Sequence, residues 1–325
     1  MAKQNKTSPM HIKRKLIIHP EELTSAFVDR LVSLGTDTLG IHPTGGEGAK
    51  DSLSRLVDLF ENAEFRETLD YAARSGLKIE YELHAGGYLM PRELFDIHPE
   101  YFRMNEDGER VADFNFCVSN DEALELVADR AALLTERLYR SEPRYHLWLD
   151  DKKDAQCLCE KCRKLTPSDK QLIVMNKAVK RIRERQPAAA LSYLAYFECI
   201  NPPSMIQPED GIFLEYAPFE KYTAKGEGAD ALIENERKML GKLIDCFGKE
   251  ESEILEYWYD NSLLSDWKYP PRKFTPNGAK ISSEIAEYEA LSPYCISSFA
   301  CFLGKDYEAL YGEADLSDFA KQLNL

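Results

Sequence analysis

The stretch RYHLWLDDKKDAQCLCEKCRKLTPSDKQLIVMNKAVKRIRER (144–185) holds one complete strand–loop–helix unit. Its apolar run YHLWL is typical of a buried strand. A polar loop follows, with the adjacent acids Asp150 and Asp151 and then a CxCxxC triplet. The residues from Ser168 onward have the apolar spacing of a helix. The unit therefore predicts a strand that leads through a functional loop into a helix.

The same alternation of short apolar runs and amphipathic stretches continues along the chain. The predicted strands are KLIIH (15–19), TLGIH (38–42), LKIEYELH (77–84), YHLWLDD (145–151), ALSYLAYFE (190–198), GIFLEYAP (211–218), EILEYWYDN (253–261) and CISSFACF (295–302). The predicted helices are 20–35, 64–77, 119–138, 168–185, 229–247, 278–291 and 315–325.

Eight strands that alternate with helices predict a (β/α)8 TIM barrel, one domain over 1–325 with residues 1–12 disordered. The link CINPPSMIQPEDG after residue 198 has no clear helix, so one helix of the ring is not predicted. A doubly wound open sheet is the alternative. Such sheets usually begin with a glycine-rich phosphate loop, and TGGEGAKDS (44–52) lacks the required spacing.

The charge balance excludes two classes of partner. With 41 Lys and Arg against 56 Asp and Glu, the net charge is −15. This disfavours binding to nucleic acid and to anionic membranes, since both require clustered basic residues. No apolar run approaches a membrane span and no secretory signal is recognised, so a cytoplasmic location is expected. The eight cysteines are then expected to be reduced.

The candidate site residues are sought at the carboxyl ends of the predicted strands, because barrel enzymes bind their substrates there. Carboxylates can transfer protons, and aromatic rings can stack on the faces of sugars. The catalytic candidates are Asp151, Asp150, Glu215, Glu256 and Asp260. The candidates for substrate binding are His19, His42, His84, Tyr88, Tyr196, Tyr216, Trp258 and Asn261.

Two motifs resemble a large bacterial family, the domain of unknown function 4838. They are HPEYFRMNEDGERVADFNFCVSNDEAL (98–124) and the segment from HLWLDD to RERQP (146–187). The resemblance implies a glycoside-hydrolase-like barrel, similar to alpha-glucuronidases and hexosaminidases, that acts on a carbohydrate or glycoconjugate without an organic cofactor. It implies that Asp151 is the strand-end acid and that Cys117, Cys157, Cys159 and Cys162 are family cysteines.

The adjacent aspartates also resemble those of O-GlcNAcase-type enzymes. That resemblance implies that Asp150 orients the acetamido group of an N-acetylhexosaminide and that Asp151 is the general acid and base. The alternative is a direct mechanism, with Asp151 as acid and Glu215, Glu256 or Asp260 as the second carboxylate. A glucuronide substrate is equally open at this stage.

The cysteines and histidines leave two further hypotheses. Cys157, Cys159 and Cys162, with Cys117 as fourth ligand, predict a structural Zn²⁺ that clamps two loops. The alternative is reduced thiols packed under a loop. His19, His42 and His84 suggest a metal-dependent barrel hydrolase or isomerase as a competing function. A non-catalytic carbohydrate-binding barrel is the other alternative.

Overall fold

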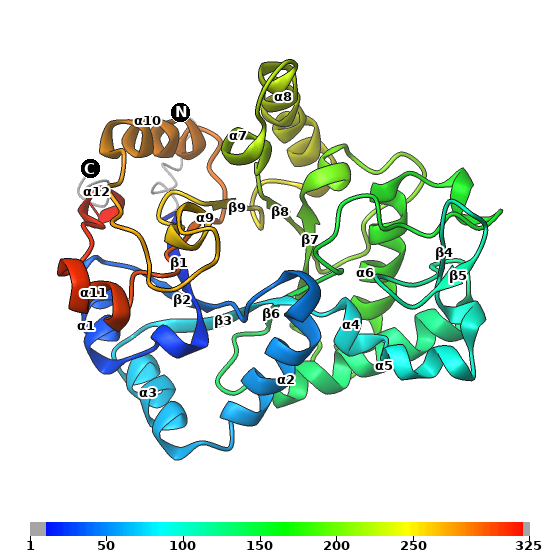
Figure 1. Ribbon diagram of the computed structural model, residues 1–325, viewed down its shortest axis with the longest axis horizontal. Coiled ribbons are helices and arrows are strands. Elements are labelled where there is room, and N and C mark those ends of the chain that lie inside the picture. The colour runs from blue at the N-terminus through cyan, green and yellow to red at the C-terminus, as the bar shows by residue number, and fades with distance from the viewer. Residues whose placement is uncertain (1–10, 321–325) are drawn as a thin grey trace, which may run out of the picture.

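Eight parallel strands close into a barrel in the order β1-β10-β9-β8-β7-β6-β3-β2, which confirms the predicted architecture (Figure 1). The computed structural model describes residues 11–320. The ring is closed where Arg14 of the first strand pairs with Ile296 of the last. The barrel strands are β1 (Lys13–Ile18), β2 (Thr38–Ile41), β3 (Lys78–His84), β6 (Arg144–Trp148), β7 (Ala190–Ala195), β8 (Ile212–Tyr216), β9 (Glu253–Glu256) and β10 (Cys295–Phe299).

Helices surround the strands (Figure 1). Side chains of Asn120 and Thr166 accept hydrogen bonds from the first turns of α5 and α6 and fix where these helices begin. The longer helices are α1 (Ser25–Ser33), α2 (Ala49–Leu59), α3 (Ala63–Arg74), α5 (Asp121–Arg137), α6 (Pro167–Arg183), α8 (Ala229–Phe247) and α10 (Gly278–Glu289). The shorter ones are α4 (Gly86–Leu89), α7 (Glu220–Thr223), α9 (Asn261–Leu264), α11 (Lys305–Tyr311) and α12 (Ser317–Ala320).

The prediction located every barrel strand but misplaced several ends. The strands predicted over 145–151, 190–198 and 253–261 end earlier, at Trp148, Ala195 and Glu256. Apolar and aromatic residues continue past these ends because they line a cavity, so composition alone does not mark the boundary. Helix α2 and the hairpin of β4 (Arg103–Met104) and β5 (Arg110–Val111) were not predicted.

The predictions for the link after residue 198 and for the two ends of the chain can be compared with the structure only in part. That link contains only a short 3-10 helix, Phe197–Ile200, as the sequence indicated. The predicted disorder of 1–12 and the end of the helix predicted over 315–325 fall mostly on residues 1–10 and 321–325, which lie outside the described residues. Among the described residues of the segment 1–12, Nε2 of His11 lies 3.0 Å from the carboxylate of Asp37.

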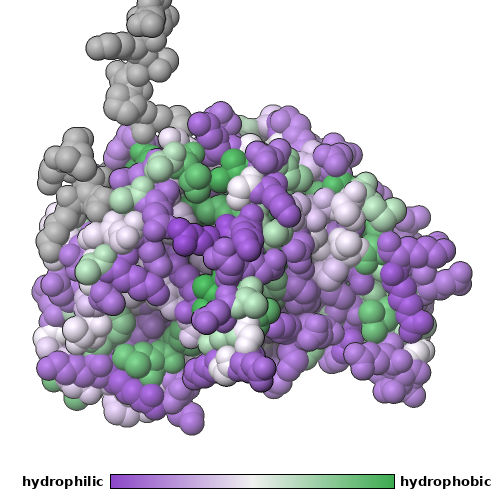
Figure 2. Space-filling model, turned by 90° about the horizontal axis from the view of Figure 1, so that it is seen from above, coloured by the Kyte–Doolittle hydropathy of each residue, from purple (hydrophilic) through white to green (hydrophobic). Residues whose placement is uncertain are grey.

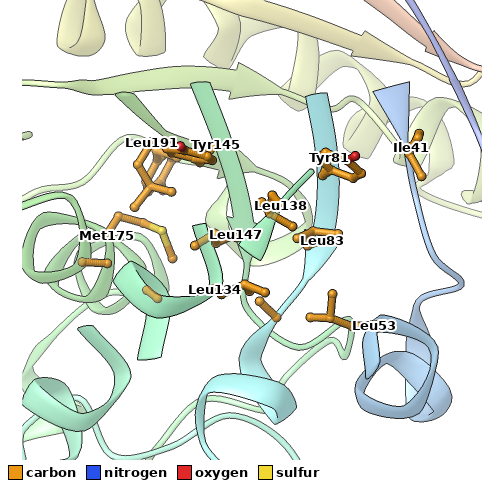
Figure 3. Close-up of a cluster of buried hydrophobic side chains, with 14 of the residues drawn as sticks. Ile41, Leu53, Tyr81, Leu83, Leu134, Leu138, Tyr145, Leu147, Met175 and Leu191 are labelled. Carbon is orange, nitrogen blue, oxygen red and sulfur yellow. The ribbon is translucent and has the colours of Figure 1, made fainter. Parts of the chain in front are cut away.

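Outward-facing strand residues make the main hydrophobic core. Tyr81 and Leu83 of β3, Tyr145 and Leu147 of β6 and Leu191 of β7 pack towards the helices with side chains such as Met175 of α6 (Figure 3). Successive strand residues point to opposite faces, so their neighbours point into the barrel. There a group of buried charged side chains lies next to a second, smaller hydrophobic cluster that includes Ile17, Trp148 and Leu255.

The lumen is filled by a buried ionic cluster. The Nζ atom of Lys15 lies 2.8 Å from Glu80, 2.5 Å from Glu82 and 2.7 Å from Glu253, and all four residues are buried. Burial would lower the pKa of Lys15, but the charges of Glu253, Glu80 and Glu82 raise it well above its usual value. Lys15 therefore stays charged and neutralises the glutamates around it.

His146 is the second cation of this cluster, with ring nitrogens 3.1 Å from Glu80, 3.0 Å from Glu82 and 2.9 Å from Glu215. Burial would lower the pKa of His146, but the charges of Glu215 and Glu82 raise it to about 10. Burial raises the pKa of Glu82 to about 8. The geometry of these carboxylates and His146 would suit a metal ion, but the ammonium group of Lys15 already provides the positive charge there.

Replacement of Lys15 by Met is expected to destabilise the barrel. The substitution removes the buried ammonium group that Glu80, Glu82 and Glu253 share, and such a loss costs about 3–5 kcal/mol. Urea unfolding measures the change. Lys13→Met is the matched control, because the Nζ atom of Lys13 pairs with the carboxylate of Asp37 at 3.2 Å near the surface, and the loss of this pair should cost less than about 1 kcal/mol. Equal costs for the two variants would contradict the role of the lumen cluster.

The outer surface is consistent with the acidic composition. Figure 2 shows a face that is mainly hydrophilic, with separate, small hydrophobic areas. Within residues 11–320, no helix combines the length and apolarity needed to cross a membrane.

Candidate active site

A cavity of about 310 Å³ opens at the carboxyl ends of the barrel strands. It brings together six of the predicted site residues, contributed by strands or loops all around the ring. These residues are His19, His42, His84, Asp151, Tyr196 and Asp260. The strand-end argument therefore located the cavity, although it did not select all of the right residues.

Three histidines form one side of the cavity rim, each at the end of a neighbouring strand. The ring centroids of His19 and His42 are 5.9 Å apart, and those of His42 and His84 are 5.7 Å apart. Each ring reaches the backbone of the next segment. Nδ1 of His19 contacts the carbonyl of His42 at 2.7 Å, Nδ1 of His42 that of Glu82 at 2.8 Å, and Nδ1 of His84 that of Leu149 at 3.0 Å.

These contacts fix the tautomer of the rings. A carbonyl oxygen only accepts hydrogen bonds, so each Nδ1 must carry the proton. In a neutral ring, Nε2 is then an acceptor. Burial, together with the neighbouring His84 and His19, lowers the pKa of His42 well below its usual value, so this ring stays neutral. Of the groups of described residues whose geometry would suit a metal ion, none includes His19, His42 or His84.

Asp151 and Asp260 are the carboxylates that line the cavity among the described residues. Asp151 follows the end of β6, and its Oδ1 lies 3.4 Å from the hydroxyl group of Tyr196. Asp260 begins α9, where its Oδ1 accepts hydrogen bonds from the backbone N–H of Ser262 at 3.0 Å and from its hydroxyl group at 2.5 Å. Burial raises the pKa of Asp260, opposed by the hydrogen bonds from Ser262 and by His19.

The charges of Asp151 and Asp260 both affect the pKa of Tyr257. Its phenol lines the same cavity. Burial raises the pKa of Tyr257 first, and the charges of Asp151 and Asp260 raise it further. One cavity thus holds two carboxyl groups, the number that a two-carboxylate reaction uses.

Asp150 does not line the cavity, whereas Asp151 does. Its Oδ1 accepts the N–H of Gly87 at 2.7 Å, its Oδ2 accepts the N–H of Asn115 at 2.5 Å, and Arg92 forms an ion pair with it. Addition of a Cβ to Gly86 would place it 2.6 Å from Oδ1 of Asp150. The glycine pair of HAGGY therefore lets the backbone approach this carboxylate, and Asp150 holds loops together.

Glu215 and Glu256 lie outside the cavity lining. Glu215 is in the lumen, where it contacts His146 and accepts a hydrogen bond of 2.7 Å from Nε1 of Trp148. Glu256 points outward from β9 and contacts Lys221 at 2.5 Å and the hydroxyl groups of Tyr222 and Tyr288. Since Leu255 and Tyr257 line the cavity, alternation along the strand turns Glu256 away from it.

The remaining predicted binding residues also lie elsewhere. Tyr88 contacts Arg130 and Arg137 outside the barrel. Tyr216 lines a groove with residues of α8 and α10. Nε1 of Trp258 donates to Glu284 at 2.5 Å. The side chain of Asn261 donates to the backbone carbonyls of Arg272 and Phe302 at 2.9 and 3.2 Å, and so holds two loops together.

Several cavity residues were not among the predicted ones. Alternation from the inward-facing Leu255 could have identified Tyr257. Phe219 and Trp267 come from loops, and Trp267 has a φ of 53°, so no strand or helix pattern indicates where its side chain points. The further aromatic residues that line the cavity are Trp148 and Phe299.

Four cysteines lie together beside the cavity loops, as the sequence predicted. Cys117, Cys157, Cys159 and Cys162 are buried and free, and their sulfur atoms all lie within 4.8 Å of one another. The Sγ atom of Cys117 is 3.7 Å from that of Cys159 and 4.0 Å from that of Cys162. Four sulfurs at the usual Zn–S distance of about 2.3 Å would be about 3.8 Å apart in a tetrahedron. The cluster therefore has the dimensions of a four-cysteine metal site.

Asn115 connects this cluster to the cavity loop. Its side-chain oxygen accepts the N–H of Asp150 at 3.1 Å, and its side-chain nitrogen donates to the carbonyl of Ala155 at 3.1 Å. Ala155 and Asn115 each lie two residues before a cysteine of the cluster. The hairpin joins the same assembly, because the N–H of Leu158 donates to the carbonyl of Met104 at 2.9 Å.

Replacement of Gly45 by Ala is expected to impair the cavity without unfolding the protein. An added Cβ would lie 2.9 Å from the ring of His84 and 3.2 Å from the carboxylate of Asp151, so both groups must shift. We expect at least a tenfold loss of ligand affinity or turnover with an unchanged melting temperature. Gly48→Ala is the matched control, because no atom lies within 4 Å of its added Cβ. Equal behaviour of the two variants would contradict the placement of His84 and Asp151.

The sequence matches one family model, described as Domain of unknown function (DUF4838), over residues 59–239. This agrees with the resemblance carried by the two motifs. No curated protein sequence matches the chain.

Several solved structures are similar in shape. Endo-glycoceramidase II from Rhodococcus sp., as a lactosyl-enzyme intermediate, has a TM-score of 0.55 and 10% identity, with 89% of this chain and 73% of that chain covered. The five-membered iminocyclitol complex of the same enzyme has a TM-score of 0.52 and 12% identity, with 89% and 72% covered. The chain thus shares the barrel fold of glycoside hydrolases.

Proposed function

The protein belongs to the DUF4838 family, whose model covers more than half of the chain, and on that premise we propose that it is a glycoside hydrolase. The observation that carries the proposal is the presence of two carboxylates, Asp151 and Asp260, in one strand-end cavity walled by aromatic rings. Hydrolysis of a glycosidic bond needs one carboxyl group to protonate the leaving oxygen and a second carboxylate to act at the anomeric carbon.

We assign the general acid to Asp151. The leaving group must depart towards solvent, so the acid that protonates it lies on the open side of the cavity. Asp151 is followed by the exposed residues 152–154, whereas Asp260 is followed by the buried Asn261 and Ser262. The hydroxyl group of Tyr196 lies 3.4 Å from Oδ1 of Asp151 and leaves this carboxyl group free to reach a substrate.

Asp260 is then the second carboxylate, acting as nucleophile or as base. Its two hydrogen bonds from Ser262 fix one oxygen and leave the other for the reaction. The substrate-assisted route is less well supported, because it needs Asp150 to orient an acetamido group. Both oxygens of Asp150 are already engaged by Gly87, Asn115 and Arg92.

The role of Asp260 predicts how activity depends on pH. Asp260 must be ionised to act, and burial raises its pKa above the usual value of 3.8. Activity should therefore be lost as the pH falls through this raised pKa, with the acidic limb of kcat/KM above pH 3.8. In Ser262→Ala, which removes one of the hydrogen bonds that favour the ionised form, the limb should move to higher pH. A limb that stays in place would argue against Asp260.

Release of phenol from a panel of aryl glycosides tests the proposal. The panel covers both anomers of glucose, galactose, mannose, fucose, N-acetylglucosamine and glucuronic acid, with native protein at several pH values. Turnover of at least one member that Asp151→Asn abolishes is the expected result. If no member is hydrolysed by protein that is folded and metal-loaded, the hydrolase proposal fails and a sugar-binding role remains.

We further propose that the cysteine cluster holds a structural Zn²⁺. The sulfur–sulfur distances support this proposal. Two hydrogen-bond donors near the cluster also support it, because they would stabilise a metal-bound thiolate: a side-chain nitrogen of Arg110 and the N–H of Met104 lie 3.8 and 3.4 Å from Sγ of Cys157. Four protein ligands leave no open coordination position, so the ion would stabilise the loops and take no part in the reaction. Through Asn115, it would hold the segment that presents Asp151.

A further inference from the structure

The lining of the cavity carries information about the charge of its ligand. Among the residues that the structure describes, no lysine or arginine lines it. Three cations near Asp151 have other contacts: Arg92 pairs with Asp150, Lys153 contacts Glu220 at 3.1 Å, and the Nζ atom of Lys152 lies 5.3 Å from the centre of the Phe114 ring. Lys15 is enclosed by three glutamates in the lumen. Among the described residues, the cavity lining itself therefore offers no lysine or arginine to pair with an anionic sugar.

The charged groups that do line the cavity would repel an anion. Asp151 and Asp260 both contribute carboxylates. The remaining walls combine apolar side chains such as Leu194, Leu255 and Phe299 with the neutral hydroxyl groups of Tyr196 and Tyr257, and none of these groups carries a positive charge. A sugar carboxylate would lose its hydration on entry without gaining a counter-ion, and that loss is costly in an apolar site.

The histidine rim, in contrast, suits hydroxyl groups. Nδ1 of His19, His42 and His84 is committed to backbone carbonyls. Within residues 11–320, the side-chain hydrogen bonds of these rings are made by Nδ1, and all three rings line the cavity. Three neutral rings with Nε2 as acceptor can each accept a hydrogen bond from a hydroxyl group of a sugar.

We propose that the cavity takes a neutral glycosyl group, whose hydroxyl groups donate to Nε2 of His19, His42 and His84, and that it rejects sugars that carry a carboxylate. The inference rests on the proposed function and narrows its substrate. It favours neutral sugars, N-acetylhexosaminides among them, and excludes glucuronides.

Binding of paired methyl glycosides tests the inference. Each neutral sugar (glucoside, galactoside) is compared with the uronide of the same configuration and anomer by titration calorimetry at pH 8, above the ordinary titration range of imidazole. At least one neutral member should bind ten times or more tightly than its uronide. Thr44→Lys, which places a cation at the exposed cavity mouth, should reduce that ratio.

Variants of one histidine test the hydroxyl contacts separately. His84→Phe keeps a ring but removes the acceptor, and should weaken binding of the neutral sugar about tenfold. His84→Gln, whose amide oxygen can accept in place of Nε2, should restore part of the affinity. Unchanged affinity in His84→Phe would overturn the contact.

The outcomes separate this inference from the proposed function. A uronide that binds as tightly as its neutral partner, or is hydrolysed as fast, overturns the inference alone and leaves the hydrolase proposal standing. If no glycoside of either kind binds or is hydrolysed, both are overturned.

Discussion

Asp151→Asn is expected to lower kcat about 10²- to 10⁴-fold on glycosides with poor leaving groups, because the amide cannot protonate the leaving oxygen. The fold should not change. Asp151 is only partly buried, and its one side-chain hydrogen bond, from Tyr196 at 3.4 Å, is weak. Steady-state kinetics on a substrate identified from the aryl glycoside panel, together with thermal unfolding, measures both effects.

Asp154→Asn provides the matched control. Asp154 lies three residues further along the same loop, is exposed, and has a φ of 59°, which asparagine tolerates as well as aspartate. The control should keep native kcat. Turnover that survives in Asp151→Asn would remove Asp151 from the mechanism, and a loss shared by both variants would indicate a general effect on the loop.

Cys162→Ser is expected to abolish bound zinc and to destabilise the protein by at least about 3 kcal/mol, since a metal site with a missing thiolate no longer stabilises the folded state. Elemental analysis of native protein should find one Zn²⁺ per chain, and a chelator should lower the melting temperature. Turnover should fall as well, because the cluster holds Asn115 and, through it, the segment of Asp150.

Cys246→Ser is the control, because this partly buried thiol lies apart from the cluster. It should leave metal content and stability within the range of surface substitutions, about 0.5 kcal/mol. Native protein without stoichiometric zinc, or a Cys162→Ser variant as stable as Cys246→Ser, would contradict the metal site and favour packed, reduced thiols.

The barrel was predictable because its signals are local and repeated. Strands such as β6 carry an apolar outward face, as in Tyr145 and Leu147, and helices such as α5 and α6 begin at a capping side chain. The strand-end histidines followed from the same pattern, since residues 19, 42 and 84 end three successive predicted strands. The cysteine cluster was predictable from spacing within one loop and from the family motif.

The choice among acids was not predictable, because it depends on where a strand stops being regular. Whether Asp150 or Asp151 faces the cavity is decided by the end of β6 at Trp148 and by Arg92, Asn115 and Gly87, which come from distant segments. Alternation alone could have excluded Glu256 and Tyr216 once Leu255 and Glu215 were placed inside. Trp267 could be placed only by tertiary structure.

The most direct test of the central claim compares Asp151→Asn and Asp260→Asn on two substrates that differ only in their leaving groups. With a 2,4-dinitrophenyl glycoside, whose leaving group departs without protonation, Asp151→Asn should retain most of the native rate of bond cleavage. With the corresponding phenyl glycoside it should lose nearly all of it, whereas Asp260→Asn should fail on both. Equal losses for Asp151→Asn on the two substrates, or full activity of Asp260→Asn, would contradict the account.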